Sequence, residues 1–237
     1  MTERHLSSQF DSDLNGVSSQ LMEMGGLVEA QIQRAIAALT NFSPALVEEV
    51  ARIEEKVNAM EIAIDRALTS VVARRQPAAR DLRLLLAISK ITTNLERVGD
   101  EAHKIARRVK SIVESGDARR MPIGDLRMAS DLAADLVGRA LDAFVRLDVD
   151  AALAVIKEDE LINSEFKGFI HKLIAYMMED PRTISSSLDL LFVAKAVERI
   201  GDHAKNVAKF VIYIVSGDDV RHSSLTRGVR SDPGSPP

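Results

Sequence analysis

One phrase occurs twice in the chain, as LERVGDEAHKIA at residues 95–106 and as VERIGDHAKNVA at residues 197–208. Most paired positions are identical or similar, and each copy carries a Glu, three residues and then an Asp preceded by Gly. Apolar residues recur in both copies at intervals of three and four, which is typical of an amphipathic helix. The repeat therefore predicts two equivalent helices in a duplicated chain.

The duplication extends beyond this phrase. With an offset of 105 residues, Leu21 aligns with Leu126 and Val50 aligns with Val155. The offset falls to 102 only after the loops near Pro77 and Pro181. A period of this length indicates a duplicated domain rather than a solenoid repeat.

Proline and glycine divide each half into three long segments. We expect six helices, over about residues 5–39, 44–74, 78–115, 122–147, 149–179 and 184–215. Long helices with short connections form bundles. The predicted fold is therefore all-α, with two tandem three-helix bundles at 5–116 and 122–216, and we expect the Ser-, Gly- and Pro-rich tail at 217–237 to be disordered.

Composition narrows the possible functions. The 237 residues carry a net charge of −4, which argues against nucleic-acid binding, and they include no Cys that could form a disulfide or a thiolate metal site. The N-terminal residues lack the apolar stretch of a signal peptide, and no apolar run approaches the length of a membrane span. We expect a cytoplasmic protein.

The repeated acids predict a metal site. At 100° per residue, Glu96 and Asp100 lie side by side on one flank of the apolar stripe, and Glu198 and Asp202 do the same. Like charges at this spacing destabilise a helix by about 0.2–0.5 kcal/mol, and a mid-helix Gly costs about 1 kcal/mol relative to Ala. A bound cation would offset the repulsion. We therefore predict that both pairs hold Mg²⁺, Mn²⁺ or iron, the alternative being two pairs of solvated surface acids.

Two further polar positions recur in both halves. Glu54 aligns with Asp159, and Asn58 aligns with Asn163. These side chains could support the metal ligands or form hydrogen bonds between helices, and the second role is favoured for the Asn pair.

Three other residues are weaker candidates. Glu61 and Asp65 repeat the acid spacing, but they align with Phe166 and Ile170, so we interpret them as surface acids. His103 falls on the acid flank and could be a ligand in the first half only.

Catalytic motifs are missing from the sequence. No Glu-x-x-His of the di-iron type stands beside either acid pair, and there is no P-loop, G-x-S-x-G or H-E-x-x-H. We therefore expect that the protein is not an enzyme. A metal-dependent helical-bundle enzyme or an iron-storage protein remains the alternative, and a metal-free scaffold is a third hypothesis.

The chain resembles the PhoU family of phosphate transport accessory proteins. The resemblance rests on the two quoted phrases, on the opening segment at 5–39, on IEEKVNAMEIAID at 53–65 and on the duplicated six-helix layout. It implies metal ions on the bundle surfaces, held here by Glu96 and Asp100 and by Glu198 and Asp202.

The resemblance also implies a function. Such a protein would be a cytoplasmic negative regulator of the phosphate-starvation response. Its expected partners are the ATPase of the ABC phosphate transporter and the phosphate-sensing histidine kinase. The resemblance further implies a homodimer that reaches the membrane only through these partners.

Overall fold

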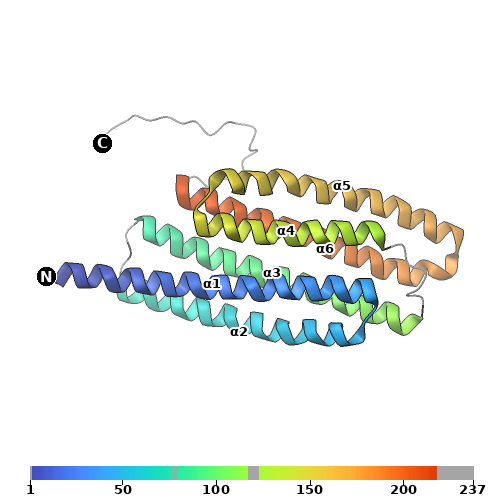
Figure 1. Cartoon of the computed structure of the whole chain (residues 1–237), viewed down its shortest axis with the longest axis horizontal. Coiled ribbons are helices and arrows are strands. Elements are labelled where there is room, and N and C mark those ends of the chain that lie inside the picture. Colours follow the sequence, from blue (N-terminus) through green and yellow to red (C-terminus); the bar gives the residue numbers. More distant parts are fainter. Residues whose placement is uncertain (1, 76, 78, 117–122, 218–237) are drawn as a thin grey trace.

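The computed structural model describes residues 2–75, 77, 79–116 and 123–217. The helices are α1 (Thr2–Asn41), α2 (Pro44–Arg75), α3 (Ala79–Ser115), α4 (Gly124–Arg146), α5 (Val149–Glu179) and α6 (Ile184–Ser216), with a short 3₁₀ helix at Pro181–Thr183. These described residues contain no strand. The predicted all-α fold with six long helices is confirmed (Figure 1).

Local sequence explains where the helices end. Gly116 follows α3 and Gly217 follows α6, and both have φ of +80°, the left-handed conformation that glycine adopts without steric cost. Leu147, which we had placed within the fourth helix, instead follows α4 with φ of +51°. The side chain of Asp148 then accepts a hydrogen bond from the Ala151 amide at 3.0 Å and caps α5.

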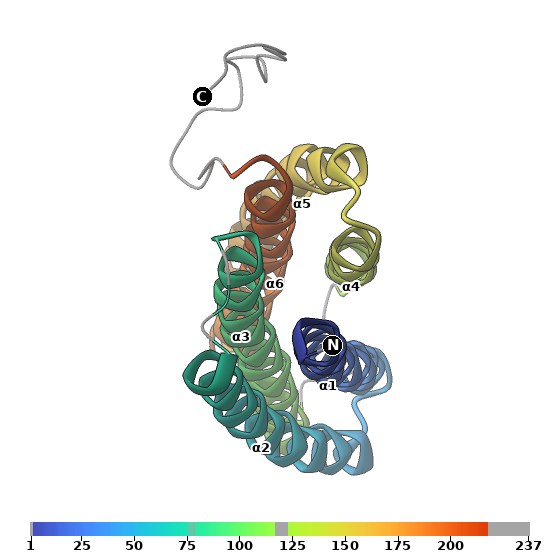
Figure 2. The ribbon, with the colours of Figure 1, turned by 90° about the vertical axis from the view of Figure 1, so that its left-hand side faces the viewer.

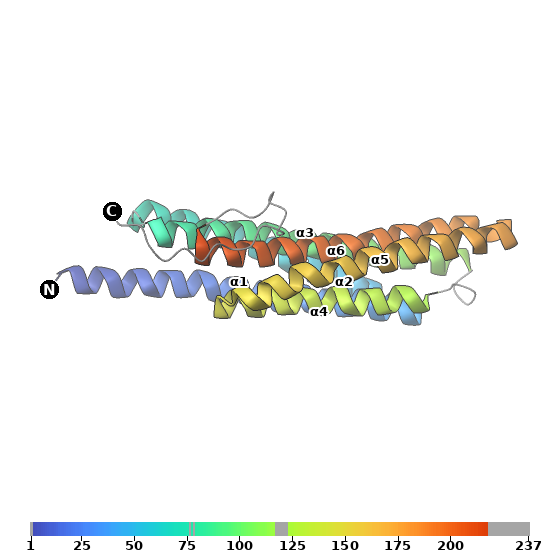
Figure 3. The ribbon, with the colours of Figure 1, turned by 90° about the horizontal axis from the view of Figure 1, so that it is seen from above.

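The two halves lie side by side. Seen end-on, α2, α3, α6 and α5 form a curved row, and α1 and α4 pack against the same side of that row (Figure 2). α3 and α6 run along each other at the centre of the molecule, and their long axes remain adjacent in the view from above (Figure 3). Each half therefore contributes its third helix to the contact between the halves.

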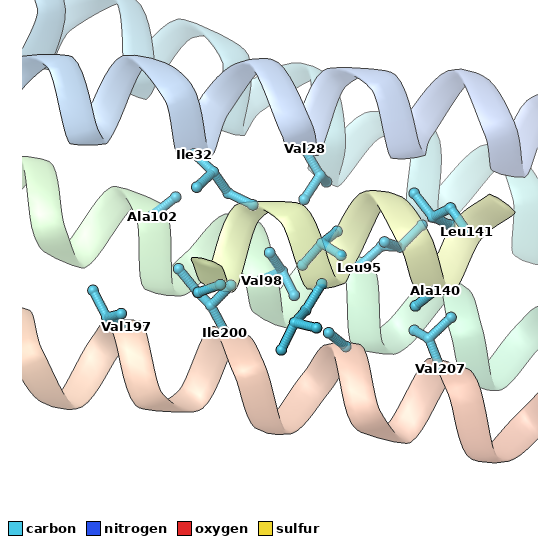
Figure 4. Packing of buried hydrophobic residues seen from close by; sticks show 14 of the residues in the cluster. Val28, Ile32, Leu95, Val98, Ala102, Ala140, Leu141, Val197, Ile200 and Val207 are labelled. Carbon is cyan, nitrogen blue, oxygen red and sulfur yellow. The ribbon is translucent and has the colours of Figure 1, made fainter. Parts of the chain in front are cut away.

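One hydrophobic core runs through both halves. Leu95 and Val98 of α3 pack near Val28 of α1, while Val197 and Ile200 of α6 face them from the second half (Figure 4). α3 and α6 bury apolar residues toward their own bundle and toward each other. The two halves therefore share one continuous hydrophobic core.

Part of the predicted domain organisation stays a prediction. The expected boundary near residues 117–122 lies outside the described residues, as does the expected tail at 217–237 apart from Gly217. Among the helices that the structure does describe, none combines the length and the hydropathy needed to cross a membrane.

Candidate functional site: two acid pairs on the central helices

Both acid pairs stand on unbroken helix. Glu96 and Asp100 lie in α3 and Glu198 and Asp202 lie in α6, so the two carboxylates of each pair are one helical turn apart. All four residues are half-buried. The structure therefore has the helical phase predicted from the sequence. We call Glu96 and Asp100 the first acid pair, and Glu198 and Asp202 the second acid pair.

The first acid pair has acidic neighbours on α2. Burial raises the pKa of Glu96, and the charges of Asp100, Glu61 and Glu54 raise it further, against the opposing effect of Arg97. Burial and then the charge of Asp65 raise the pKa of Glu61, which also feels Asp100. Glu61, which we interpret as a surface acid, is half-buried on α2, and its charge acts on Glu96 of the first pair.

A buried polar network lies behind Gly99. The Gln31 amide donates to Glu54 Oε2 at 2.6 Å and to the Gly99 carbonyl at 3.1 Å. A Cβ at position 99 would stand 2.9 Å from Gln31 Oε1 and 3.2 Å from Glu54 Oε2. The absence of a side chain at Gly99 thus lets this network approach the backbone of α3.

The second acid pair has lysines among its carboxylates. Lys195 Nζ lies 2.6 Å from Glu198 Oε2, and Lys205 Nζ lies 2.8 Å from Asp159 Oδ2. Burial raises the pKa of Asp202, as do the charges of Asp159 and Glu198, while the two lysines lower it. The second half therefore already balances part of its negative charge with its own side chains.

Asp159 occupies the place that Glu54 has in the first half. Both are buried, Asp159 to 1% exposure, and a Cβ at Gly201 would come within 2.9 Å of Asp159 Oδ1. The Asn163 amide donates to the Asp159 carbonyl at 3.3 Å, whereas Asn58 is exposed. The recurring acids are thus structurally equivalent, but the recurring asparagines are not.

His103 on α3 and His203 on α6 lie in different surroundings. His103 is half-buried on α3, on the side of the first acid pair. His203 turns to the contact between α3 and α6, where its Nδ1 lies 3.0 Å from Asn94 Oδ1.

The residues present fit a cation at each acid pair. Gln31 Oε1 and Asp159 Oδ1 are buried oxygens without a hydrogen-bond partner, and each lies close to the glycine beside an acid pair. Carboxylate and amide oxygens are the ligands that hard cations prefer. In the side-chain conformations of residues 2–75, 77, 79–116 and 123–217, however, no three His, Asp or Glu converge closely enough to hold a metal ion. Binding would therefore require side-chain rearrangement.

A third polar region joins the halves, and the sequence did not indicate it. Glu101 on α3 is only 5% exposed, and its Oε1 accepts from both Lys104 Nζ at 3.0 Å and Arg199 Nη1 at 3.2 Å. Further along, Asp189 of α6 accepts from Arg108 at 3.1 Å and from Ser111 at 2.8 Å. The bonds from Arg199 to Glu101 and from Arg108 and Ser111 to Asp189 join α3 to α6, and we call this contact the seam.

Comparison with known proteins supports one family. The family model "PhoU domain" matches residues 21–109 and 126–211, one match in each half. The chain is 48% identical over 225 residues to a protein of Burkholderia sp named phosphate-specific transport system accessory protein PhoU homolog, with 94% of this chain and 96% of that protein covered. It is 41% identical over 220 residues to the PhoU protein of that name from Escherichia coli (strain K12), with 92% and 90% covered.

Solved structures agree with this assignment. The crystal structure of PhoU from Pseudomonas aeruginosa superimposes with a TM-score of 0.85 at 44% sequence identity, covering 88% of this chain and all of that one. PhoU from Streptococcus pneumoniae, at 23% identity, has the same fold with a TM-score of 0.82. Duplicated helices, repeated acid pairs and full-length similarity lead to one conclusion: the chain belongs to the PhoU family.

Proposed function

We propose that this protein is a cytoplasmic negative regulator of phosphate uptake and of the phosphate-starvation response. The observation that carries the proposal is the full-length similarity to proteins named accessory proteins of the phosphate-specific transport system. In this role the chain would act without catalysis, as a homodimer that links the ATPase of the ABC phosphate transporter to the sensor histidine kinase.

The architecture suits such a role. A regulator transmits a state by binding one form of its partner more tightly than another. The long helices and shared core provide a rigid scaffold with extended faces on which a partner can dock. The names of the relatives, which describe accessory proteins and no enzymatic reaction, also favour binding over catalysis.

Deleting the gene tests the regulatory proposal directly. Phosphate-responsive genes should then be expressed in phosphate-rich medium, because the link that represses them is missing. A reporter fused to such a promoter measures the effect, and the intact gene on a plasmid should restore repression. Normal repression in the deletion strain would refute the proposed role.

Metal binding is the second part of the proposal. Glu96 and Asp100 would hold an ion in the first half, and Glu198 and Asp202 would hold one in the second, with Mg²⁺, Mn²⁺ or iron as the candidates. Burial and then the crowding of negative charge raise the pKa of Glu96, and a bound cation would relieve that crowding. Lys195 lies 2.6 Å from Glu198, whereas Lys104 lies 3.9 Å from Asp100, so the lysine competes less closely at the first pair, which should bind more tightly.

The two pairs can be tested separately. Replacing Glu96 by Gln and Asp100 by Asn should remove most of the tightly bound metal, whereas the same changes at Glu198 and Asp202 should remove less. Elemental analysis after purification without chelator and dialysis against limiting Mn²⁺ gives the stoichiometry. Equal losses in the two double variants would contradict the predicted difference, and unchanged metal in both would refute the site.

A further inference from the structure

Beside the acid pairs, the seam carries a hollow that is lined by Asp100 and Asp202 together with basic side chains that neither proposed role uses. It has a volume of about 550 Å³ and lies between α3 and α6. Ten polar or charged side chains line it: Arg97, Asp100, Glu101, Lys104, Arg199, Asp202, His203, Lys205, Asn206 and Lys209. We call it the seam hollow.

The duplication of the chain explains which residue types line the seam hollow. Arg97 and Arg199 are equivalent residues of the two halves, as are Asp100 and Asp202. Because α3 and α6 lie side by side with their repeated phrases at the same level, one hollow receives the same residue types from both halves. Each chain therefore has one such hollow, shared by its two halves.

Positive charge predominates in the seam hollow. Five basic side chains line it against three carboxylates, with histidine counted as neutral. Lys104 and Arg199 share a single buried carboxylate oxygen of Glu101 and are therefore held near each other. Arg97 forms no hydrogen bond or ion pair with any residue that the structure describes. The hollow thus presents the guanidinium group of Arg97 beside Lys104 and Arg199, which share one carboxylate oxygen of Glu101.

Basic groups inside the seam hollow also repel one another. The pKa of Lys209 is lowered, first by burial and then by the charge of Lys205, while Asp159 and Asp202 oppose the shift. An anion placed between these side chains would remove the repulsion.

The carboxylates of the seam hollow would favour phosphate over other anions of similar shape. A phosphate ion near neutral pH keeps a proton that it can donate to a carboxylate such as Asp100 or Asp202, and its other oxygens accept from arginine and lysine. Sulfate carries no such proton, so the same carboxylates would repel it. A mixture of basic and acidic side chains therefore favours phosphate over an anion of similar shape.

From this arrangement we infer that the seam hollow binds a phosphate group, with Arg97, Arg199 and Lys104 as donors and an acidic side chain as acceptor for the phosphate proton. The inference goes beyond the proposed function and does not depend on metal binding. It would allow the protein to respond to phosphate directly as well as through its partners.

Equilibrium dialysis of the metal-free full-length protein against inorganic phosphate tests this inference. Binding should be saturable at one site per chain, and Arg97→Gln should weaken it about tenfold, since one charge-assisted hydrogen bond is lost. Arg97 is exposed, so the variant should keep its fold, and far-UV circular dichroism checks this. Arg52→Gln, a change at an exposed arginine of α2, should bind as the original protein does.

Two competition experiments, with sulfate and with ATP, test which anion the seam hollow prefers. Sulfate at equal concentration should displace phosphate about tenfold less effectively, because it lacks the proton. Tighter binding of ATP than of inorganic phosphate, if it depends on Arg97, would identify the source of the phosphate group as a nucleotide. Absence of saturable binding, unchanged binding by Arg97→Gln, or equal competition by sulfate would overturn the inference. The deletion strain tests the regulatory role independently of this outcome.

Discussion

Replacing Lys205 by methionine should lower the free energy of unfolding by about 3–5 kcal/mol, because it leaves a buried carboxylate without its counter-ion. Asp159 is 1% exposed, and its Oδ2 lies 2.8 Å from Lys205 Nζ. Asn163 Nδ2 lies 3.4 Å from the same oxygen but carries no charge, and the other oxygen is buried and accepts no hydrogen bond. Urea denaturation followed by circular dichroism measures the loss.

Two controls separate charge burial from simple loss of a lysine. The double variant with Asp159→Leu and Lys205→Met removes both charges and should recover most of the stability, since apolar groups of similar size often replace a buried pair without cost. Lys172→Met breaks a surface pair with Asp125 and should leave the unfolding curve nearly unchanged. A similar loss in Lys172→Met and Lys205→Met would contradict the explanation.

Gly201→Ala should also destabilise the protein, although alanine is the better helix former. The new Cβ would lie 2.7 Å from Ile162 Cδ1 and 2.9 Å from Asp159 Oδ1. Overpacking of this kind costs about 1–3 kcal/mol, and the gain in helix propensity returns about 1 kcal/mol. We expect a net loss of up to about 2 kcal/mol, and for a chain of this size each kcal/mol lowers the Tm by about 2–4 °C.

The chain offers a matched control for this change. Gly168 lies within α5, and a Cβ there would meet nothing within 4 Å. Gly168→Ala should therefore raise the stability by about 0.5–1 kcal/mol through helix propensity alone. Thermal unfolding of both variants should give shifts of opposite sign. A stabilised Gly201→Ala would show that Asp159 and Ile162 move aside at little cost.

Much of the fold could be predicted because its signals are local. Pro44 begins α2, and glycines at 116 and 217 follow α3 and α6, as the sequence indicated. The helical phase of Glu96 and Asp100 was equally readable, since both positions lie within one uninterrupted helix. The end of α4 was misplaced by one residue, because Leu147 adopts a left-handed conformation that its residue type does not announce.

The surroundings of the acid pairs were harder to predict. Lys195 lies three residues before Glu198, so that ion pair could have been found from helical spacing. The approach of Glu61 to Glu96 and of Lys205 to Asp159 could not, because it depends on how α2 and α5 are rotated against the central helices. The alignment of the halves even argued against Glu61, which has an apolar counterpart in the second half.

Sequence alone determined the six helices, the duplication and the spacing that places two carboxylates together on each central helix. These follow from the period of the α-helix and from residues that begin or end it, and both act over a few neighbouring positions. Tertiary structure decided that α3 and α6 lie together in one shared core, that Lys205 of α6 pairs with the buried Asp159 of α5, and that equivalent arginines meet at one hollow. The rotation and offset between helices arise from side-chain packing across the whole molecule, which no single segment encodes.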